Sequence, residues 1–375
     1  MADRLAGGIM IFFLSLFAGK RAAMPVKAAK ILLCKFYGMG SIIQITPLLA
    51  SLKKTYPGAE LVFVTSARNT ALVGSIPLID RGIFLKEGGF PRIIALLPGL
   101  LRQVRREKAD VFIDLEVYSN TSAILCRLSR AGFKTGLYKK AQRTRLYDNS
   151  VYFDTERPIV DSYLQFSDPA HSRQLFLIKG HEDPDGIRSK LRLPPGTDKL
   201  IVVNVNASDL RIERRWPPAQ FARLVSLLAL RHADHFFVFT GSSAERGYTQ
   251  SVIRLLDPEA GKKAINSAGQ LSFAELVTLF HMSTLIITND TGPMHLAAAM
   301  NKNTVALFGP CAPAQYLALP HITVIYKKVS CSPCVHTSLI SPCRGDNTCM
   351  KQISPEEVLK ACERLLEPAP EDQVS

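Results

Sequence analysis

The seven residues 289–295, an Asn-Asp-Thr-Gly-Pro-Met-His sequence, constrain the fold of this chain most strongly. They follow an apolar run at residues 284–288 and precede an alanine-rich, helix-like run. A helix that begins directly after a strand directs its first backbone N–H groups at a ligand, because those groups lack partners within the helix. Pro293 suits the first helical turn, and Gly292 lets a phosphate approach the backbone. The pattern predicts an α/β protein with Asp290 at the carboxyl end of a strand, where open sheets bind ligands.

The length and the alternation of apolar and helix-like runs predict two α/β domains. At 375 residues the chain exceeds one ordinary core, so two domains of roughly 150 residues are expected. Strands are predicted at residues 30–34, 59–65, 110–115, 200–205, 235–240, 285–288 and 304–308, and helices at 46–54, 221–230 and 273–281. Strands separated by helices imply parallel sheets. We therefore predict two Rossmann-like, doubly wound domains that face a central cleft.

The domain boundaries are predicted from composition. Residues 179–199 are polar and rich in glycine, proline and charge, as in an interdomain linker. The domains are then residues 25–178 and residues 200–367. A hydrophobic segment is predicted at residues 1–24 and a disordered tail at residues 368–375.

The charge of the chain is strongly positive and unevenly distributed. The formal net charge is +14. Seven basic residues and no acidic one lie within one stretch, namely Arg127, Arg130, Lys134, Lys139, Lys140, Arg143 and Arg145. A second basic cluster comprises Arg102, Arg105, Arg106 and Lys108. These residues form either an ordinary solvated surface or a basic wall that faces anionic lipid head groups or an anionic acceptor. No nucleic-acid motif accompanies the charge, so no nucleic-acid partner is expected.

The N-terminus carries an uncharged run of 15 residues, residues 5–19, between Arg4 and Lys20. A spanning helix needs about 17–25 residues, so this run is short for one. A signal peptide is one alternative, but the basic residues that follow favour retention on the cytoplasmic side. We predict a segment that dips into the membrane or marginally spans it and holds the protein at the cytoplasmic face of the inner membrane. A buried N-terminal helix is the other alternative.

Several segments resemble one family. Residues 290–295 followed by residues 304–310 resemble the motif of glycosyltransferase family 9, the heptosyltransferases that build the inner core of bacterial lipopolysaccharide. The other segments that match are a first loop and helix (residues 38–49), a basic-x-Trp-Pro signature (residues 214–217) and a cysteine-rich region (residues 331–350). The resemblance keeps the order of these segments and covers about residues 30–360.

The resemblance implies a GT-B fold with the acceptor in the N-terminal domain and the nucleotide-diphosphate sugar in the C-terminal domain. It implies an inverting transfer that requires no metal ion or other cofactor. The family's default donor is ADP-heptose. The expected acceptor is anionic: a lipopolysaccharide core, another lipid-linked glycan or a polysaccharide. Gly40, Arg143 and Arg145 are the residues expected to contact it.

The resemblance also assigns the donor site. The Thr291 and Gly292 amides and the Arg214 side chain would stabilise the leaving diphosphate, which departs with added negative charge. Asp290 would bind the donor sugar, and His295 would lie near the phosphates. The expected donor-binding residues are Asn206, Ser208, Arg214, Gly241, Glu245, Asp290, Thr291, Gly292, Met294 and His295. A plain surface charge is the alternative for Arg214, since charged residues flank it.

One position departs from the family pattern. Heptosyltransferases carry an Asp after the Gly of the first loop, as the base that deprotonates the acceptor; here Ser41 stands there. A hydroxyl cannot act as a general base unless another group activates it. We predict that Asp114 or Glu116, at the end of a strand in the same domain, replaces it. A more acidic acceptor is one alternative. A non-catalytic protein that binds nucleotide sugars or glycans is the other.

A dinucleotide-binding oxidoreductase is disfavoured. Gly38 and Gly40 begin a Gly-x-Gly-x-x-Gly pattern after a strand, but Ile43 occupies the third glycine position. An incomplete fingerprint is weak evidence for a dinucleotide site.

Four of the eight cysteines cluster, namely Cys331, Cys334, Cys343 and Cys349. In a cytoplasmic protein such clustering indicates a structural zinc site or reduced thiols more than disulfides. The spacing departs from a paired Cys-x-x-Cys site, so both alternatives stay open. The remaining cysteines are predicted to be ordinary thiols: Cys34, Cys126, Cys311 and Cys362.

Overall fold

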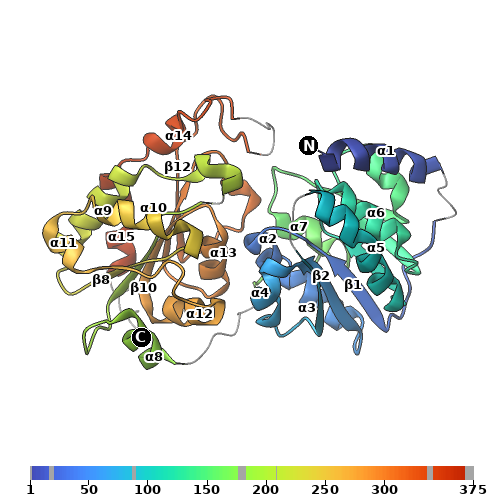
Figure 1. Ribbon diagram of the computed structural model, residues 1–375, viewed down its shortest axis with the longest axis horizontal. Helices are drawn as coiled ribbons and strands as arrows, with labels where there is room; N and C mark the ends of the chain where they lie inside the picture. Colours follow the sequence, from blue (N-terminus) through green and yellow to red (C-terminus); the bar gives the residue numbers. More distant parts are fainter. Residues whose placement is uncertain are drawn as a thin grey trace, which may run out of the picture. The chain divides into compact units, whose positions relative to one another are not determined.

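The structure of the protein, a computed structural model, describes residues 2–16, 21–86, 90–175, 183–207, 209–335 and 341–367. The chain divides into two compact units, Met1–Phe176 and Leu177–Ser375 (Figure 1). The predicted linker lies in the second unit, and part of it forms helix α8 (Pro184–Leu191). The side chain of Asp183 caps this helix by accepting a hydrogen bond from the Gly186 amide. The predicted disordered tail lies outside the described residues.

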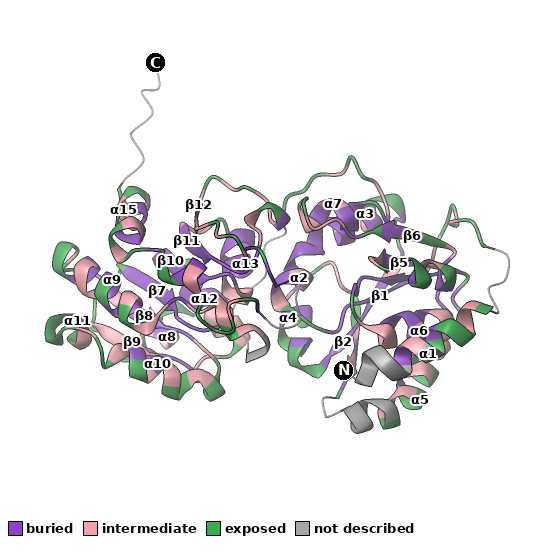
Figure 2. Cartoon of the chain, turned by 90° about the horizontal axis from the view of Figure 1, so that it is seen from above, coloured by how far each residue is buried: buried purple, intermediate pink, exposed green. Residues whose placement is uncertain are grey.

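The first unit contains a six-stranded parallel sheet in the order β3-β2-β1-β4-β5-β6. Its strands are β1 (Lys30–Cys34), β2 (Glu60–Ser66), β3 (Arg81–Leu85), β4 (Val111–Asp114), β5 (Phe133–Tyr138) and β6 (Asn149–Tyr152). Its helices are α1 (Ala2–Leu16), α2 (Met39–Gln44), α3 (Thr46–Thr55), α4 (Thr70–Gly74), α5 (Phe90–Arg106), α6 (Asn120–Leu128) and α7 (Ile159–Leu164), with 3-10 turns η1 (Ala67–Asn69) and η2 (Ala141–Leu146). The central strands are buried (Figure 2), as expected of a parallel sheet that helices cover on both faces.

The second unit contains another six-stranded parallel sheet, in the order β12-β11-β10-β7-β8-β9. Its strands are β7 (Leu200–Asn204), β8 (Phe236–Phe239), β9 (Ala264–Asn266), β10 (Ser283–Asn289), β11 (Thr304–Phe308) and β12 (Ile322–Tyr326). Its remaining helices are α9 (Pro218–Arg231), α10 (Arg246–Ile253), α11 (Pro258–Lys262), α12 (Phe273–Met282), α13 (Gly292–Ala299), α14 (Thr348–Lys351) and α15 (Pro355–Leu366), with 3-10 turns η3 (Asp209–Arg214), η4 (Ser243–Glu245) and η5 (Pro313–Gln315).

Both sheets have the strand order of a Rossmann fold. Numbered by appearance within its own unit, each sheet runs 3-2-1-4-5-6. The winding reverses between β1 and β4 in the first unit and between β7 and β10 in the second. Ligands of doubly wound sheets bind at the carboxyl ends of the strands at this reversal. The prediction of two Rossmann-like domains is therefore confirmed, and each unit has a defined place for a site.

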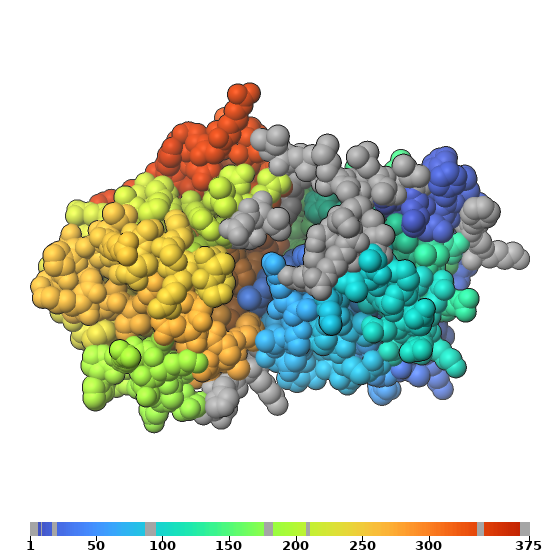
Figure 3. Space-filling view, viewed as in Figure 1, coloured from blue at the N-terminus to red at the C-terminus, as the bar shows by residue number. Residues whose placement is uncertain are grey.

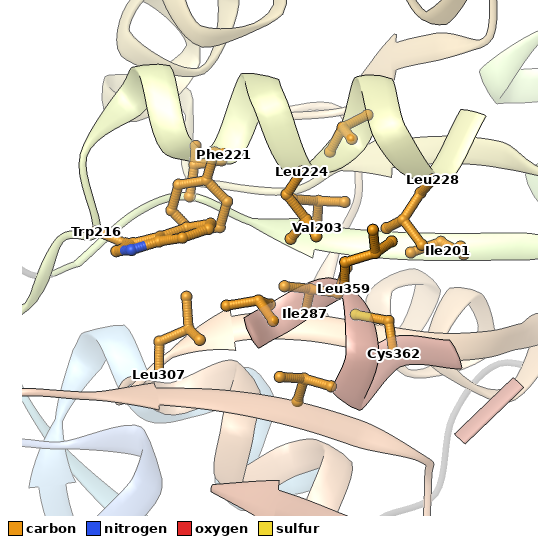
Figure 4. Packing of buried hydrophobic residues seen from close by; sticks show 14 of the residues in the cluster. Ile201, Val203, Trp216, Phe221, Leu224, Leu228, Ile287, Leu307, Leu359 and Cys362 are labelled. Atoms are coloured by element: carbon orange, nitrogen blue, oxygen red, sulfur yellow. The ribbon is translucent and has the colours of Figure 1, made fainter. Parts of the chain in front are cut away.

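Trp216 anchors the core of the second unit. Its ring is fully buried and packs edge-to-face on Phe221, with 4.8 Å between the ring centroids (Figure 4). Its indole N–H donates to the carbonyl oxygen of Ile353 at 3.0 Å, which satisfies the buried polar group. The segment that ends in Trp216 is therefore fixed against the sheet, and with it the position of the preceding Arg214.

Helix α1 corrects the prediction of an N-terminal membrane segment. Within the described residues, no helix has both the length and the apolar character that crossing a bilayer requires. Instead α1 packs on α6 and η2, and Ile11 joins the hydrophobic core of the first unit. Gly7 approaches Asn120 so closely that an added Cβ would lie 2.6 Å from the Asn120 Cβ. The expectation of a marginally spanning segment is wrong; α1 packs on the domain along one side, but it is not the buried helix of the alternative, because its other side is exposed.

Candidate functional site

The carboxyl ends of β7 and β10 meet at the reversal point of the second sheet, and Asn289 ties them together. Its side-chain amide donates to the carbonyl oxygens of Val205 and Asn206, both at 3.1 Å. Its side-chain oxygen accepts from the backbone N–H of Trp216 at 3.1 Å. One buried asparagine thus joins the loop after β7, the end of β10 and the segment that carries Arg214.

Helix α13 begins at this crossing. Its N-cap residue, Thr291, has extended backbone angles, and its side chain makes no capping bond. The hydroxyl of Thr291 instead accepts from the Asn204 amide at 2.9 Å. Pro293 occupies the first turn, where its missing N–H costs nothing. The uncapped start of α13 therefore has the anion-binding character that the sequence predicts.

Asp290 and Arg214 form the polar centre of this site. Asp290 is only 2% exposed. The Arg214 Nε lies 3.7 Å from its Oδ2, and the Arg214 Nη1 donates to the Asp290 carbonyl oxygen at 3.4 Å. Among the described residues, neither carboxylate oxygen accepts a hydrogen bond of normal geometry, but the Tyr316 hydroxyl and the Cys311 thiol lie close enough to interact with this carboxylate. A buried carboxylate is costly unless it is hydrogen-bonded, so this group is poised for donors from a ligand, such as sugar hydroxyls.

Arg214 is a partly buried cation, 20% exposed and beside Asp290, and not the plain surface charge of the alternative interpretation. Burial lowers the pKa of Arg214, but the negative charge of Asp290 raises it, and the net shift is upward. The guanidinium therefore remains charged. A fixed positive charge beside a helix N-terminus suits the diphosphate of a sugar nucleotide.

Sequence reasoning missed two neighbours of this pair, Cys311 and Tyr316. Both side chains are buried, and burial followed by the charge of Asp290 raises the pKa of each well above its usual value. The Tyr316 ring packs edge-on to the His295 ring at 4.6 Å between centroids. The prediction that Cys311 is an ordinary thiol therefore omits its place beside Asp290. The signal in the sequence was its position directly after Gly309-Pro310, where the chain leaves β11.

His295 is buried in the first turns of α13. Burial, followed by smaller opposing effects of Asp290 and Arg214, lowers its pKa to about 4. The imidazole is therefore neutral at neutral pH, and it would act toward a phosphate as a hydrogen-bonding group without a charge.

Three of the other expected donor residues lie in the loops that follow β7 and β8. Asn206 is buried and its amide donates to the Thr240 carbonyl oxygen at 2.8 Å. A Cβ on Gly241 would lie 2.6 Å from that amide nitrogen, so only glycine fits there. Glu245 accepts from the Ser242 amide at 2.7 Å and belongs to a capping box. Ser208 lies outside the described residues.

Met294 lies in the core beside the start of α13. Its side chain is buried in an apolar cluster with Ala306, Phe308, Cys311 and Val335. Its backbone N–H donates to the Thr291 carbonyl oxygen. The side chain is therefore part of the core, because α13 turns this face toward the sheet, and the expected contact of Met294 with the donor stays a prediction.

In the first unit, Ser41 lies on α2 after the reversal-point strand β1. Gly38 precedes this helix with φ of +94°, a conformation that favours glycine. Ser41 is half-buried and interacts with the phenol of Tyr163. Burial raises the pKa of Tyr163 well above its usual value, so this neighbour supplies no base. Gly40 is buried within the same helix.

Glu116 is committed to the loop that leads to α2. One carboxylate oxygen accepts from the amides of Phe36 and Tyr37 at 2.8 and 3.0 Å. The other pairs with the Lys35 ammonium at 2.9 Å. Both oxygens are therefore occupied by the protein, and the geometry contradicts the expectation that Glu116 is poised as a general base.

Asp114 is equally committed. Its Oδ2 accepts from Arg143 at 2.9 Å, from the Tyr147 hydroxyl at 2.7 Å and from Ser122 at 3.0 Å, while Oδ1 accepts from the Glu116 amide at 3.1 Å. Asp114 is fully buried and Arg143 nearly so. Arg143 also donates to backbone carbonyls of Val117 and Glu116. The predictions of Asp114 as base and Arg143 as acceptor contact are therefore corrected, because a structural network uses both groups. Arg145 is exposed.

The clustered cysteines form no metal site within the described residues. Nowhere in that part of the chain do three Cys, His, Asp or Glu side chains gather closely enough to hold a metal ion. All four thiols are free. Burial, with a smaller effect of the other three thiols, raises the pKa of Cys349 to about 11. Structural zinc and reduced thiols at Cys331, Cys334, Cys343 and Cys349 therefore both stay predictions.

Comparisons with known proteins agree with this geometry. The family model described as glycosyltransferase family 9 (heptosyltransferase) matches residues 99–343. Lipooligosaccharide heptosyltransferase 2 of Campylobacter jejuni is 24% identical over 338 residues, which cover 88% of this chain and 95% of that protein.

Solved structures show the same fold. The Escherichia coli ADP-heptose lipopolysaccharide heptosyltransferase II aligns with a TM-score of 0.71 at 22% identity, over 90% of this chain and 98% of that one. A family 9 glycosyltransferase of Veillonella parvula aligns with a TM-score of 0.74 at 24% identity, over 92% of this chain and 99% of that one.

Proposed function

Because the chain belongs to glycosyltransferase family 9 and is a glycosyltransferase, we propose that it transfers heptose from ADP-heptose to an anionic acceptor, a lipopolysaccharide core or a related glycan. The transfer is proposed to invert the anomeric centre and to need no metal ion. The observation that carries the proposal is the buried Asp290 carboxylate, which accepts no hydrogen bond of normal geometry and lies beside Arg214. We infer the donor, ADP-heptose, from the heptosyltransferase of this fold whose name includes it.

The proposed chemistry is a single displacement. The acceptor hydroxyl oxygen bonds to the anomeric carbon while the bond between that carbon and the diphosphate oxygen breaks. The nucleoside diphosphate leaves with the bonding electrons, so negative charge grows on its oxygens. Arg214 and the first N–H groups of α13 stabilise that charge, which is the task a metal ion performs in other transferases. Asp290 accepts hydrogen bonds from the sugar and fixes its orientation.

The hydroxyl proton of the acceptor must also be removed during the transfer. Ser41 stands where the family carries its base, and both nearby carboxylates are occupied by the protein. We infer that the hydroxyl proton passes to water as the new bond forms, without a carboxylate of the first unit. This predicts slower chemistry than a carboxylate would give, because a positioned base contributes about 10²–10⁴-fold.

The test is donor turnover by the purified chain. ADP-heptose and other nucleotide sugars are incubated with a lipid acceptor extract, and released nucleoside diphosphate is measured. Release that depends on acceptor and is lost in Asp290→Ala supports the proposal. Asp257→Ala is the matched control, because Asp257 is an exposed aspartate whose side chain makes no capping bond. Tight donor binding without release under any acceptor would overturn the proposed reaction and favour a protein that only binds nucleotide sugars.

The proposed place of action is the cytoplasmic face of the inner membrane. A lipid-linked acceptor is confined to a bilayer, and nucleotide sugars are cytoplasmic metabolites. The basic surface of the first unit supports this proposal, because the inner surface of a bacterial membrane is rich in anionic lipids.

A further inference from the structure

We propose that the outward face of α1, together with the exposed basic residues of its neighbours, is a docking surface for an anionic lipid bilayer. This surface, the α1 face, comprises Met10, Phe12, Phe13 and Leu16 with Arg145 and Lys140. This docking surface depends on the proposed function in one respect, namely that the acceptor is lipid-linked. It replaces insertion of the N-terminus with peripheral contact through side chains of a helix that stays folded on the domain.

The two faces of α1 have opposite roles. Gly7, Ile11 and Leu14 recur every three or four residues, so they lie on one side of the helix. Ile11 is 4% exposed, Leu14 packs on the core of the first unit, and Gly7 approaches α6. This side is therefore held by the protein, and α1 does not need to leave the domain.

The opposite side of α1 is apolar and open. Met10, Phe12, Phe13 and Leu16 are 49%, 61%, 56% and 59% exposed. Met10, Phe13 and Leu16 follow one another at a spacing of three residues and Phe12 lies four residues before Leu16, so together they cover the side of the helix away from Gly7, Ile11 and Leu14. Figure 3 shows α1, in dark blue, at the surface of its unit. A contiguous group of large exposed apolar side chains marks a contact surface more often than a solvated one.

The positive charge around α1 favours an anionic bilayer as the partner of this surface. Two elements on which α1 packs, α6 and η2, belong to a stretch with no acidic residue from residue 117 to residue 147. Lys140 and Arg145 are exposed there, and none of the described carboxylates pairs with them. A second copy of this chain would bring the same positive charge to a symmetric interface, which disfavours self-association. Aromatic and aliphatic side chains beside basic ones suit the boundary between lipid head groups and acyl chains.

The test is flotation of the full chain with vesicles of phosphatidylcholine, with and without phosphatidylglycerol. The chain is expected to float only with the anionic vesicles, and less at high salt, because salt screens the charges. Phe12→Ser with Phe13→Ser is expected to lower the partition coefficient by roughly tenfold or more. Leu230→Ser is the matched control, because Leu230 is 80% exposed on α9 of the other unit. Arg145→Gln is expected to lower the partition coefficient about fivefold. Arg254 is an exposed arginine of the second unit, and Arg254→Gln is expected to leave the partition coefficient unchanged.

The outcomes separate this surface from the proposed function. Thermal unfolding of each variant checks that it folds, and turnover with a delipidated acceptor is expected to be unchanged, because the α1 face is remote in sequence from Asp290. Vesicle binding without any turnover would overturn the function and leave the surface standing. Equal flotation of wild type and the Phe12/Phe13 variant would overturn the surface, as would a concentration-dependent dimer that the same substitutions abolish.

Discussion

The Nε of Arg214 lies 3.7 Å from the Oδ2 of Asp290, and both side chains are largely withdrawn from solvent. This distance is longer than a hydrogen bond, so the two charges attract each other without a direct hydrogen bond between these two atoms. An open ion pair of this kind suits a site that must hold a sugar and a diphosphate together.

Replacement of Arg214 tests its role toward the leaving group. Arg214→Ala is expected to lower kcat for nucleoside diphosphate release by about 10²–10³, because a charge that stabilises the transition state is lost. Arg214→Lys is expected to restore only part of the rate, since an ammonium lacks the planar fork of a guanidinium. Arg223→Ala, at an exposed arginine of α9, serves as the control. Steady-state kinetics of the three variants measure these effects. Equal rates for Arg214→Ala and wild type would contradict the role of Arg214 in stabilising the leaving diphosphate.

Asp114→Asn tests whether this carboxylate is structural. The substitution leaves Arg143 buried without its counter-charge, so the free energy of unfolding is expected to fall by about 3–5 kcal/mol. Urea denaturation measures it, with Asp154→Asn as a control at a partly exposed pair with Arg157. A variant with unchanged stability and no turnover would instead restore Asp114 as a candidate base.

Ser41→Asp tests the missing base directly. A carboxylate at the position where the family carries one is expected to raise kcat at least tenfold, because a positioned base contributes about 10²–10⁴. The pH profile is expected to acquire a fall at acidic pH, where the new carboxylate becomes protonated. Ser172→Asp, at an exposed serine of the same unit, is the control. An unchanged rate would show that deprotonation does not limit turnover.

His295 predicts how stability depends on pH. Its pKa is lowered to about 4 in the folded protein, against about 6.5 for an unfolded chain. Between these values the unfolded state binds more protons, so stability is full above about pH 6.5 and is lost as pH falls toward 4, by about 3 kcal/mol. Denaturation from pH 7 to 4 measures the slope. His295→Gln is expected to flatten it, and an identical slope in the variant would contradict the buried neutral imidazole.

The sequence predicts local features of the site well, because a few residues determine them. The apolar run, Gly292 and Pro293 predict a strand followed by a helix N-terminus, and β10 and α13 follow that pattern. The same local logic predicts the two doubly wound sheets. Each strand or helix start is indicated by a short run of consecutive residues, and the two sheets follow from the order of these runs along the chain.

Contacts between distant residues could not be predicted in the same way. Asp114 lies 29 residues from Arg143 and 33 from Tyr147, and nothing in their local sequences shows that they share one buried network. Their residue types are equally compatible with a base and an acceptor contact. Likewise, the apolar N-terminal run reads as a membrane segment until the packing of Ile11 on the first unit is known.

The matching strand order of the two sheets bears on how the chain is made. Each sheet has all six strands within its own unit, so no strand of residues 30–152 awaits a partner from beyond residue 176. During synthesis the first half can complete its hydrogen-bonded sheet while the second half is still being translated, since domains generally fold as units. Once the whole of the first unit has left the ribosome, all six of its strands can pair with one another, and none needs a strand of the second unit to complete the sheet.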